Sequence, residues 1–128
     1  MDIAKYIDYT LLKATATPAD IEKLCKEALE YGFYSVCVNS GYVPLAAEQL
    51  KGSKVNVCTV VGFPLGAMST QAKLYETSVA LSQGAQEIDM VLNVGWLKSG
   101  ETQKVLDDIA ALKQSVGENR VLKVILET

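Results

Sequence analysis

The sequence predicts an α/β fold of about five parallel strands with intervening helices. Short runs rich in β-branched residues alternate with segments of helical periodicity along all 128 residues. The strand-like runs are apolar at nearly every position, which is typical of parallel strands covered by helices. They recur every ~20 to 35 residues, as expected of consecutive right-handed βαβ units. No linker or low-complexity segment interrupts the pattern, so we expect residues 1–128 to form a single α/β domain.

Five runs are predicted to be strands, and the short segment before the first is compatible with a helix. The runs are YIDYTLL (6–12), YSVCVNS (34–40), KVNVCTVVGFP (54–64), EIDMVLNVG (87–95) and VLKVILET (121–128). A helical pattern separates each run from the next. The predicted order is therefore strand and helix in alternation, ending on a fifth strand.

The clearest helix is expected directly after Thr17. Thr17 is a suitable N-cap, Pro18 occupies the first helical position, and Gly32 stands just past the end, where a left-handed residue is tolerated. Five apolar residues with helical spacing fall on one face. They are Ile21, Leu24, Cys25, Ala28 and Leu29.

Three further segments are predicted to be helices on the same grounds. One lies between SGE (99–101) and VGEN (116–119) and stops at Gly117, one runs from about Ser69 to Gln83 before Gly84, and a short one runs from about Val43 to Leu50. The apolar stripes expected to be buried are Val105, Leu106, Ile109, Leu112 and Val116 in the first, and Ala72, Tyr75 and Val79 in the second.

Two of the predicted strands carry a charged residue between apolar neighbours. Asp89 lies in EIDMVLNVG, and Lys123 is the only cation in VLKVILET. An ionised group in a buried strand is costly unless it is paired. The opposite signs therefore indicate one shared polar site.

Two arrangements fit five parallel strands: an open doubly wound sheet and the first part of a (β/α)8 TIM barrel. A dinucleotide-binding fold would need G-x-G-x-x-G after the first strand, where KATATPAD stands, and no Walker A loop is present. Strand alternation places Asp89 with Asn93 on one face and Lys123 with Glu127 on one face. An open sheet would turn these faces toward helices, whereas a barrel interior collects them in one site. We therefore predict an incomplete (β/α)8 TIM barrel.

The composition excludes several classes of partner. The net charge is −3 and the lysines are scattered, so the basic surface of a nucleic-acid-binding protein is missing. The N-terminus does not resemble a signal peptide, and no apolar run approaches the ~18 residues of a membrane span. We expect a cytoplasmic protein without a nucleic-acid or membrane partner.

The three cysteines are widely spaced, and the chain has no histidine. A zinc site would therefore lack most of its usual ligands. Cys25, Cys37 and Cys58 are expected to be small core residues kept reduced in the cytosol. Neither a metal nor a cofactor is expected.

Five stretches in order resemble the deoxyribose-phosphate aldolases, class I aldolases of the (β/α)8 type. They are IDYTLLKATAT, VCVNSGYVP, VCTVVGFPLG, GAQEIDMVLNVGWLKSG and LKVILET. Each alone is weak, but together they cover essentially the whole chain. The resemblance implies interconversion of 2-deoxyribose 5-phosphate with glyceraldehyde 3-phosphate and acetaldehyde through a lysine Schiff base.

The resemblance also implies roles for individual residues. Asp89 corresponds to the aspartate of the proton relay, and Lys123 to a lysine of the same polar cluster. The positions that correspond to the lining of the substrate pocket are Asp8, Thr10, Leu12 and Cys37. Tyr9 stands where the family usually has histidine, but alternate strand residues face opposite ways, so we expect little effect on the chemistry.

The family's Schiff-base lysine lies in a sixth-strand stretch like ADFVKTSTG, which this sequence does not contain. The seventh-strand lysine and the phosphate-binding loops of the family are also missing, and the chain corresponds to about five of the eight βα units. The isolated chain is thus expected to be inactive. Five strands also leave two unpaired edges, so we expect a homo-oligomer that covers them.

Two functions stay open on the sequence alone. The first is an aldolase, with Asp89 and Lys123 as members of its site. The second is a non-catalytic, self-assembling α/β unit whose buried charges only hold two strands in register. Borohydride trapping with an aldehyde distinguishes them, because only a Schiff-base enzyme yields a stable secondary amine.

Overall fold

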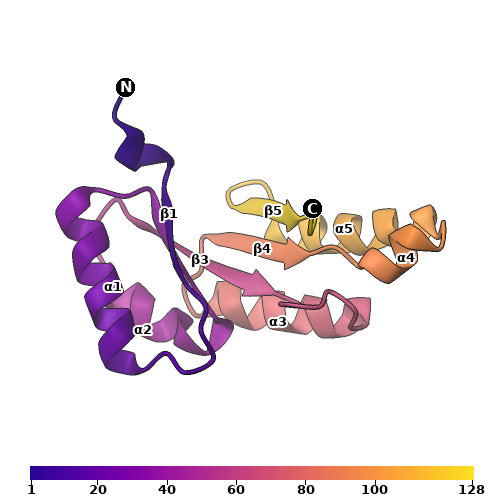
Figure 1. Cartoon of the computed structure of the whole chain (residues 1–128), viewed down its shortest axis with the longest axis horizontal. Helices are drawn as coiled ribbons and strands as arrows, with labels where there is room; N and C mark the ends of the chain where they lie inside the picture. The colour runs from indigo at the N-terminus through magenta and orange to yellow at the C-terminus, as the bar shows by residue number, and fades with distance from the viewer.

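The computed structural model of the chain describes all residues 1–128 and contains one five-stranded parallel sheet in the order β1-β2-β3-β4-β5 (Figure 1). The strands are β1 (Asp8–Leu11), β2 (Ser35–Val38), β3 (Asn56–Val61), β4 (Glu87–Val91) and β5 (Val121–Ile125). The α-helices are α1 (Pro18–Tyr31), α2 (Val43–Gln49), α3 (Thr70–Ser82), α4 (Val94–Lys98) and α5 (Thr102–Val116), and the 3-10 helices are η1 (Ile3–Tyr6) and η2 (Ser40–Tyr42). The predicted alternation of strands and helices is confirmed.

The two faces of the sheet have different surroundings. The outer face packs on the helices and forms the main core with apolar residues of α1, α2, α3 and α5; its strand residues are Val36, Val38, Val57, Val61, Ile88 and Met90. The inner face carries a small separate cluster of Cys37, Cys58 and Val60, flanked by Leu12 and Ile125, to which no helix contributes. Helices therefore cover only one face, as in the wall of a barrel, and the predicted incomplete (β/α)8 arrangement is confirmed.

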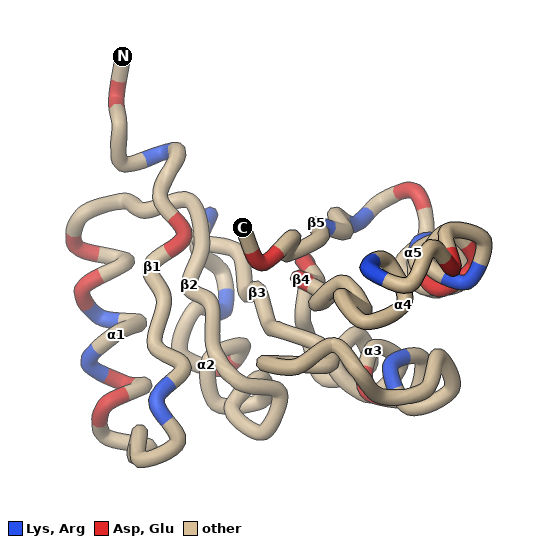
Figure 2. The backbone as a smooth tube through the Cα atoms, turned by 45° about the vertical axis from the view of Figure 1, so that its right-hand side comes forward, with Lys and Arg blue, Asp and Glu red and all other residues tan.

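Charged side chains are spread over the helices rather than collected in one patch. Acidic and basic residues both occur along α1 and α5 (Figure 2). No helix combines the length and the apolar character needed to cross a membrane. Charged residues also lie in the strands, where Asp8, Asp89 and Lys123 come close together.

Helix α1 follows its predicted signals closely. The Thr17 side chain accepts a hydrogen bond from the Asp20 backbone, and the Asp20 carboxylate accepts one from Thr17, which completes a capping box. Gly32 ends the helix with φ 67°. Of the expected stripe, only Leu29 is wrong, because it lies at the margin and is 44% exposed.

The predicted buried stripe of α3 is wrong. Tyr75 is 75% exposed and Val79 is only half-buried. The residues that α3 buries are Lys73, Thr77 and Ala80. These also have helical spacing, and the two polar ones are satisfied within the core, since the Thr77 hydroxyl donates to the Lys73 carbonyl. Because two of these buried residues are polar, the apolar pattern of the sequence could not identify the buried face of α3.

The partner stripe on α5 differs from the prediction in the same way. Val105, Leu112 and Val116 are buried as expected, but Leu106 is 55% exposed. Asp108 is buried instead, because it pairs with Lys73 of α3. The two helices are thus joined by a buried charge pair.

Strand β4 is shorter than predicted. It ends at Val91, and Asn93, expected to share the face of Asp89, caps α4 by accepting a hydrogen bond from the Trp96 backbone. In the same way β5 ends at Ile125, and Glu127 lies beyond it with φ 58°. Neither side chain therefore belongs to the inner face.

Candidate functional site

The charged side chains of the inner face meet around Lys123. Its Nζ lies 2.5 Å from Asp8 Oδ2 and 3.5 Å from Asp89 Oδ1. Asp89 is the register partner of Lys123 on the neighbouring strand, whereas Asp8 is on the opposite edge of the sheet. The structure thus brings three of the sequence-predicted residues together, supplied by β1, β4 and β5.

The Asp8 carboxylate is held in its ionised form. It accepts hydrogen bonds from Lys123 Nζ and from Ser35 Oγ, the latter at 2.6 Å. Burial alone would raise the pKa of the Asp8 carboxyl, but these two bonds outweigh it, and the pKa lies below its ordinary value. Asp8 is consequently a fixed negative charge beside the lysine.

Asp89 is in a different environment. Its side chain is 15% exposed, and Oδ1 is buried without a hydrogen-bond partner in the chain. Burial raises the pKa of Asp89, and the attraction of Lys123 offsets this only in part. A carboxyl group with a raised pKa and a free acceptor atom is a candidate for proton exchange.

Lys123 is held as a cation. Burial would lower its pKa, but the bond to Asp8 and the negative charges around it raise the pKa above the ordinary value. A protonated ammonium has no lone pair, so this amine is a poor nucleophile. The ammonium of Lys123 can therefore act on its neighbours through its charge.

Glu87 belongs to the same face but was not predicted from the sequence as a site residue. This residue lies two positions before Asp89 on the same face of β4 and is 2% exposed. Tyr34 donates to its Oε1 at 3.4 Å, Oε2 has no partner in the chain, and burial raises the pKa of Glu87. Strand alternation could have identified it, because Glu87 and Asp89 share parity.

The other predicted pocket residues take different positions. Cys37 is 3% exposed and lies in the inner cluster with Leu12 packed against it. Thr10 is exposed on β1, and its hydroxyl donates to the Asp8 carbonyl at 2.9 Å rather than to the charged groups. Tyr9 points to the outer core, where its hydroxyl donates to Glu27 at 2.7 Å, which agrees with the expectation that it lies away from the site.

Two thiols adjoin the aspartate. Cys37 and Cys58 are register partners on β2 and β3, and their sulfur atoms and an Asp89 carboxylate oxygen all lie within 4.8 Å of one another. All three cysteines are free and buried, as expected for core residues, with Cys25 on the outer face. The hydrogen bond with Cys37, together with burial, raises the pKa of Cys58. These three ligand atoms are the group in the chain that could hold a metal ion.

A buried ion pair supports the carboxyl end of β4. Lys73 is fully buried; its Nζ lies 2.6 Å from Asp108 Oδ2 and donates to the Val91 carbonyl at 3.1 Å. Asp108 also accepts from Thr70 at 2.7 Å. The last carbonyl of the strand that carries Asp89 is thereby fixed to α3 and α5.

The loop after β3, GFPLG (62–66), is fixed at the same end of the sheet. The Gly62 backbone N–H donates to Glu76 Oε1 at 2.9 Å. Gly66 has φ 65°, and a methyl group there would collide with the Leu92 carbonyl. The loop therefore packs closely on the segment that follows β4, at the carboxyl edge where barrel enzymes place their chemistry.

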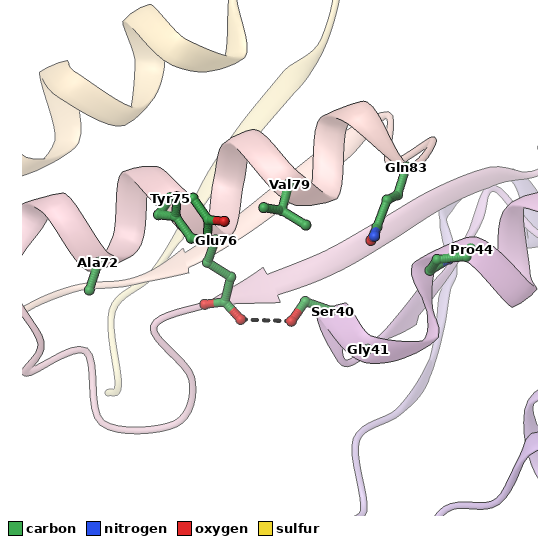
Figure 3. Close-up of a pocket in the computed structure, with 8 residues that line it drawn as sticks. All are labelled: Ser40, Gly41, Pro44, Ala72, Tyr75, Glu76, Val79 and Gln83. Atoms are coloured by element: carbon green, nitrogen blue, oxygen red, sulfur yellow. Dashed lines mark hydrogen bonds between the residues drawn. The ribbon is translucent and has the colours of Figure 1, made fainter.

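A groove of ≈ 470 Å³ between η2, α2 and α3 lies on the helical side (Figure 3). Glu76 points across it to Ser40, whose hydroxyl donates at 2.8 Å (Figure 3). Since Glu76 also accepts from Gly62, its carboxylate connects the ends of β2 and β3. The groove contains no cluster of opposed charges, and we assign it a structural role.

The chain is similar to aldolases both in sequence and in structure. Residues 3–128 match the model of the DeoC/LacD family aldolases. A candidate deoxyribose-phosphate aldolase from Coccidioides immitis is 44% identical, with a TM-score of 0.96 over 98% of this chain and 49% of that one. The aldolase QR15 is 38% identical (TM-score 0.94; 100% and 57%), and a tetrameric deoxyribose phosphate aldolase from Aeropyrum pernix is 33% identical (0.83; 98% and 52%). The chain spans about half the length of these solved structures.

Proposed function

The chain belongs to the DeoC/LacD family of aldolases, and on that premise we propose that its inner face supplies the proton-relay part of a class I aldolase site. The substrate we propose is 2-deoxyribose 5-phosphate, cleaved to glyceraldehyde 3-phosphate and acetaldehyde. The observation that supports this most directly is the position of Lys123 between Asp8 and Asp89. The similarity to the aldolases from Coccidioides immitis and Aeropyrum pernix supports the substrate class.

We propose different roles for the three charged residues. Asp89 exchanges protons with the substrate, directly or through a water molecule, at the carbinolamine, enamine and imine stages of a Schiff-base reaction. Lys123 remains a cation and stabilises the ionised state of Asp89. Asp8 holds the ammonium group in place, because it is the shorter of the two contacts. Cys37, Leu12 and Thr10 are proposed to line the substrate side of this face.

The Schiff-base nucleophile is not among these groups. Lys123 is the only lysine within the five strands, and its raised pKa opposes attack on a carbonyl carbon. Lys73 is fully buried and paired. We therefore propose that the 128-residue chain, tested by itself, has no appreciable aldolase activity.

The second candidate function is a non-catalytic, self-assembling α/β unit in which the charges are structural. What favours it is that Lys123 lies 3.5 Å from Asp89, its register partner on β4, as a contact that holds two strands in register would. We also propose association between copies and a cytoplasmic location. The association is supported by the sheet edges β1 and β5, and the location by the three free cysteines, which suit a reducing compartment.

The first experiment determines the intact mass of the chain and then incubates the same sample with acetaldehyde and sodium borohydride. We expect a mass near 13.8 kDa and no reduced adduct. A trapped lysine, located by peptide mapping, would refute the proposed inactivity and would identify a nucleophile.

The proton-relay role of Asp89 is tested by supplying the part of the aldolase that this chain does not cover. The chain is co-expressed with the complementary half of the Coccidioides immitis protein, and cleavage of 2-deoxyribose 5-phosphate is measured. We expect activity with the unchanged chain and a loss of at least about 100-fold with Asp89→Asn, the size of a general acid–base contribution. Equal activity of the two would support the structural alternative.

A further inference from the structure

The inner face holds one group of side chains that the proton relay does not use. Cys37 and Cys58 are directly paired across β2 and β3, and both are buried. With an Asp89 oxygen, their sulfur atoms form a triangle whose sides are all within 4.8 Å. Asp89 Oδ1 is buried and accepts no hydrogen bond within the chain. We propose that Cys37, Cys58 and Asp89 bind a thiophilic divalent cation, of which zinc and cadmium are the type.

The separations suit a tetrahedral ion. With metal–sulfur bonds of about 2.3 Å and metal–oxygen bonds of about 2.0–2.2 Å, tetrahedral ligands lie about 3.5–3.8 Å apart. Ligand atoms already within 4.8 Å need only small side-chain rotations to reach that spacing. The strand register fixes the backbone positions of all three, so little order has to be created on binding. The fourth position is left to water.

The charges of the site nearly balance. When the ion binds, the two S–H bonds break and their protons go to solvent, two metal–sulfur bonds form, and no atom is oxidised or reduced. Two thiolates, the Asp89 carboxylate and the Asp8 carboxylate that pairs with Lys123 then carry four negative charges. The divalent ion and the Lys123 ammonium, 3.5 Å from Asp89, carry three positive charges. The one negative charge left over is tolerated because the Asp8 side chain is 35% exposed and solvent screens it.

Occupancy would have a consequence for the chemistry, and this part of the inference rests on the proposed function. A cation on Asp89 uses the carboxylate that the relay needs, so the ion would act as an inhibitor. The binding itself depends only on the geometry of the three side chains. A binding measurement can therefore succeed or fail independently of whether the chain takes part in an aldolase.

The test uses cadmium, whose thiolate complexes absorb in the ultraviolet. The full chain is kept reduced with a phosphine and titrated with Cd²⁺ while the charge-transfer band and the heat of binding are recorded. We expect one ion per chain and a band with the intensity of two thiolates. Zn²⁺ should displace the Cd²⁺ and abolish the band. No band at equimolar Cd²⁺, or several equivalent ions per chain, would overturn the proposal.

Variants identify the ligands. Cys37→Ala and Cys58→Ala should each halve the band and weaken binding by at least about 100-fold, more than the loss of an outer-shell partner costs. Asp89→Asn should keep the two-thiolate band but weaken binding by at least about 10-fold, because a neutral amide oxygen replaces a charged ligand. Cys25→Ala is the matched control, because Cys25 is equally buried but lies in α1 on the outer face. Unchanged binding in Cys58→Ala, or loss in Cys25→Ala, would refute the assignment; circular dichroism checks that each variant is folded.

Discussion

Lys123 on β5 and Asp8 on β1 form an ion pair of 2.5 Å although three strands separate them in the sheet. Contact between side chains of the two edge strands requires the sheet to curve strongly toward its inner face. The same contact places a cation beside Asp89, the neighbour of Lys123 in register. The curvature of the sheet and the geometry of the site therefore depend on the same contacts, which join Asp8, Asp89 and Lys123, with Ser35 bonded to Asp8.

Removing the Asp8 charge should change the pKa of Asp89 but have little effect on the free energy of unfolding. Both partners of the pair are about one-third exposed, at 36% and 35%, so solvent screening limits the pair to about 1 kcal/mol or less. Asp8→Asn should accordingly lower the free energy of unfolding in urea by no more than that at pH 7. The lost contact should also free Lys123 to bond to Asp89, which lowers the Asp89 pKa, as carbon-detected NMR titration would show. A loss well above 1 kcal/mol would mean that the pair is more buried in solution.

The same pair predicts how stability changes with acid. Because the folded-state pKa of Asp8 lies below its ordinary value of 3.8, the pair stabilises the fold above that value. The contribution is lost as the pH falls from 3.8 through the lower, folded-state pKa. Urea unfolding measured at a series of pH values should show a shallower acid dependence in Asp8→Asn than in the unchanged chain. Parallel curves for the two proteins would contradict the prediction.

Glu87 should have the opposite effect. Burial raises its pKa in the folded chain above the ordinary value of 4.5. Between these two values the folded state binds more protons than the unfolded state, so stability falls as the pH rises through that window. Glu87→Gln removes the cost of an ionised buried carboxylate, and its free energy of unfolding at pH 7 should be equal to or higher than that of the unchanged chain. A destabilised variant would show that the Glu87 charge is used, with Tyr34 as its evident partner.

Removing one partner of the buried Lys73–Asp108 pair should strongly lower the free energy of unfolding. Lys73→Met leaves Asp108 as an unpaired charge that is only 2% exposed, which costs about 3–5 kcal/mol. The matched control is Lys104→Met, because the Lys104–Glu101 pair is 58% and 41% exposed, and its loss should change stability only slightly. Adding Asp108→Leu to Lys73→Met should restore much of the loss. Chemical unfolding of the unchanged chain and of these three variants gives the free energies, and equal effects in the two single lysine variants would contradict the assignment.

The strands and their order could be predicted because buried parallel strands are continuous apolar runs in the sequence. The meeting of Asp89 and Lys123 could be predicted because their charges are opposite and a barrel interior collects such strand residues in one site. The stripe of α3 could not be predicted by an apolar pattern, because Lys73 is buried through a partner 35 positions away in sequence. The contact between Lys123 and Asp8 was also out of reach, since it depends on the curvature of the whole sheet. For Cys58 and Glu87, strand alternation could predict the face of the sheet on which they lie. Only the strand register shows which residues they contact.

Gly66 fixes the loop after β3 on the backbone after β4. Its φ of 65° is strained for any residue with a side chain, and an added methyl group would also collide with the Leu92 carbonyl. Gly100 has φ 81° but would place a methyl group in open space, so Gly100→Ala measures the backbone strain alone, about 1 kcal/mol. Gly66→Ala should cost a further 1–3 kcal/mol or so from the collision. Because Leu92 follows directly on the strand that carries Asp89, the displaced backbone should also shift the amide resonances of Asp89 in Gly66→Ala and leave them unchanged in Gly100→Ala. Equal stabilities for the two variants would mean that the loop moves aside without cost and does not position the carboxyl end of β4.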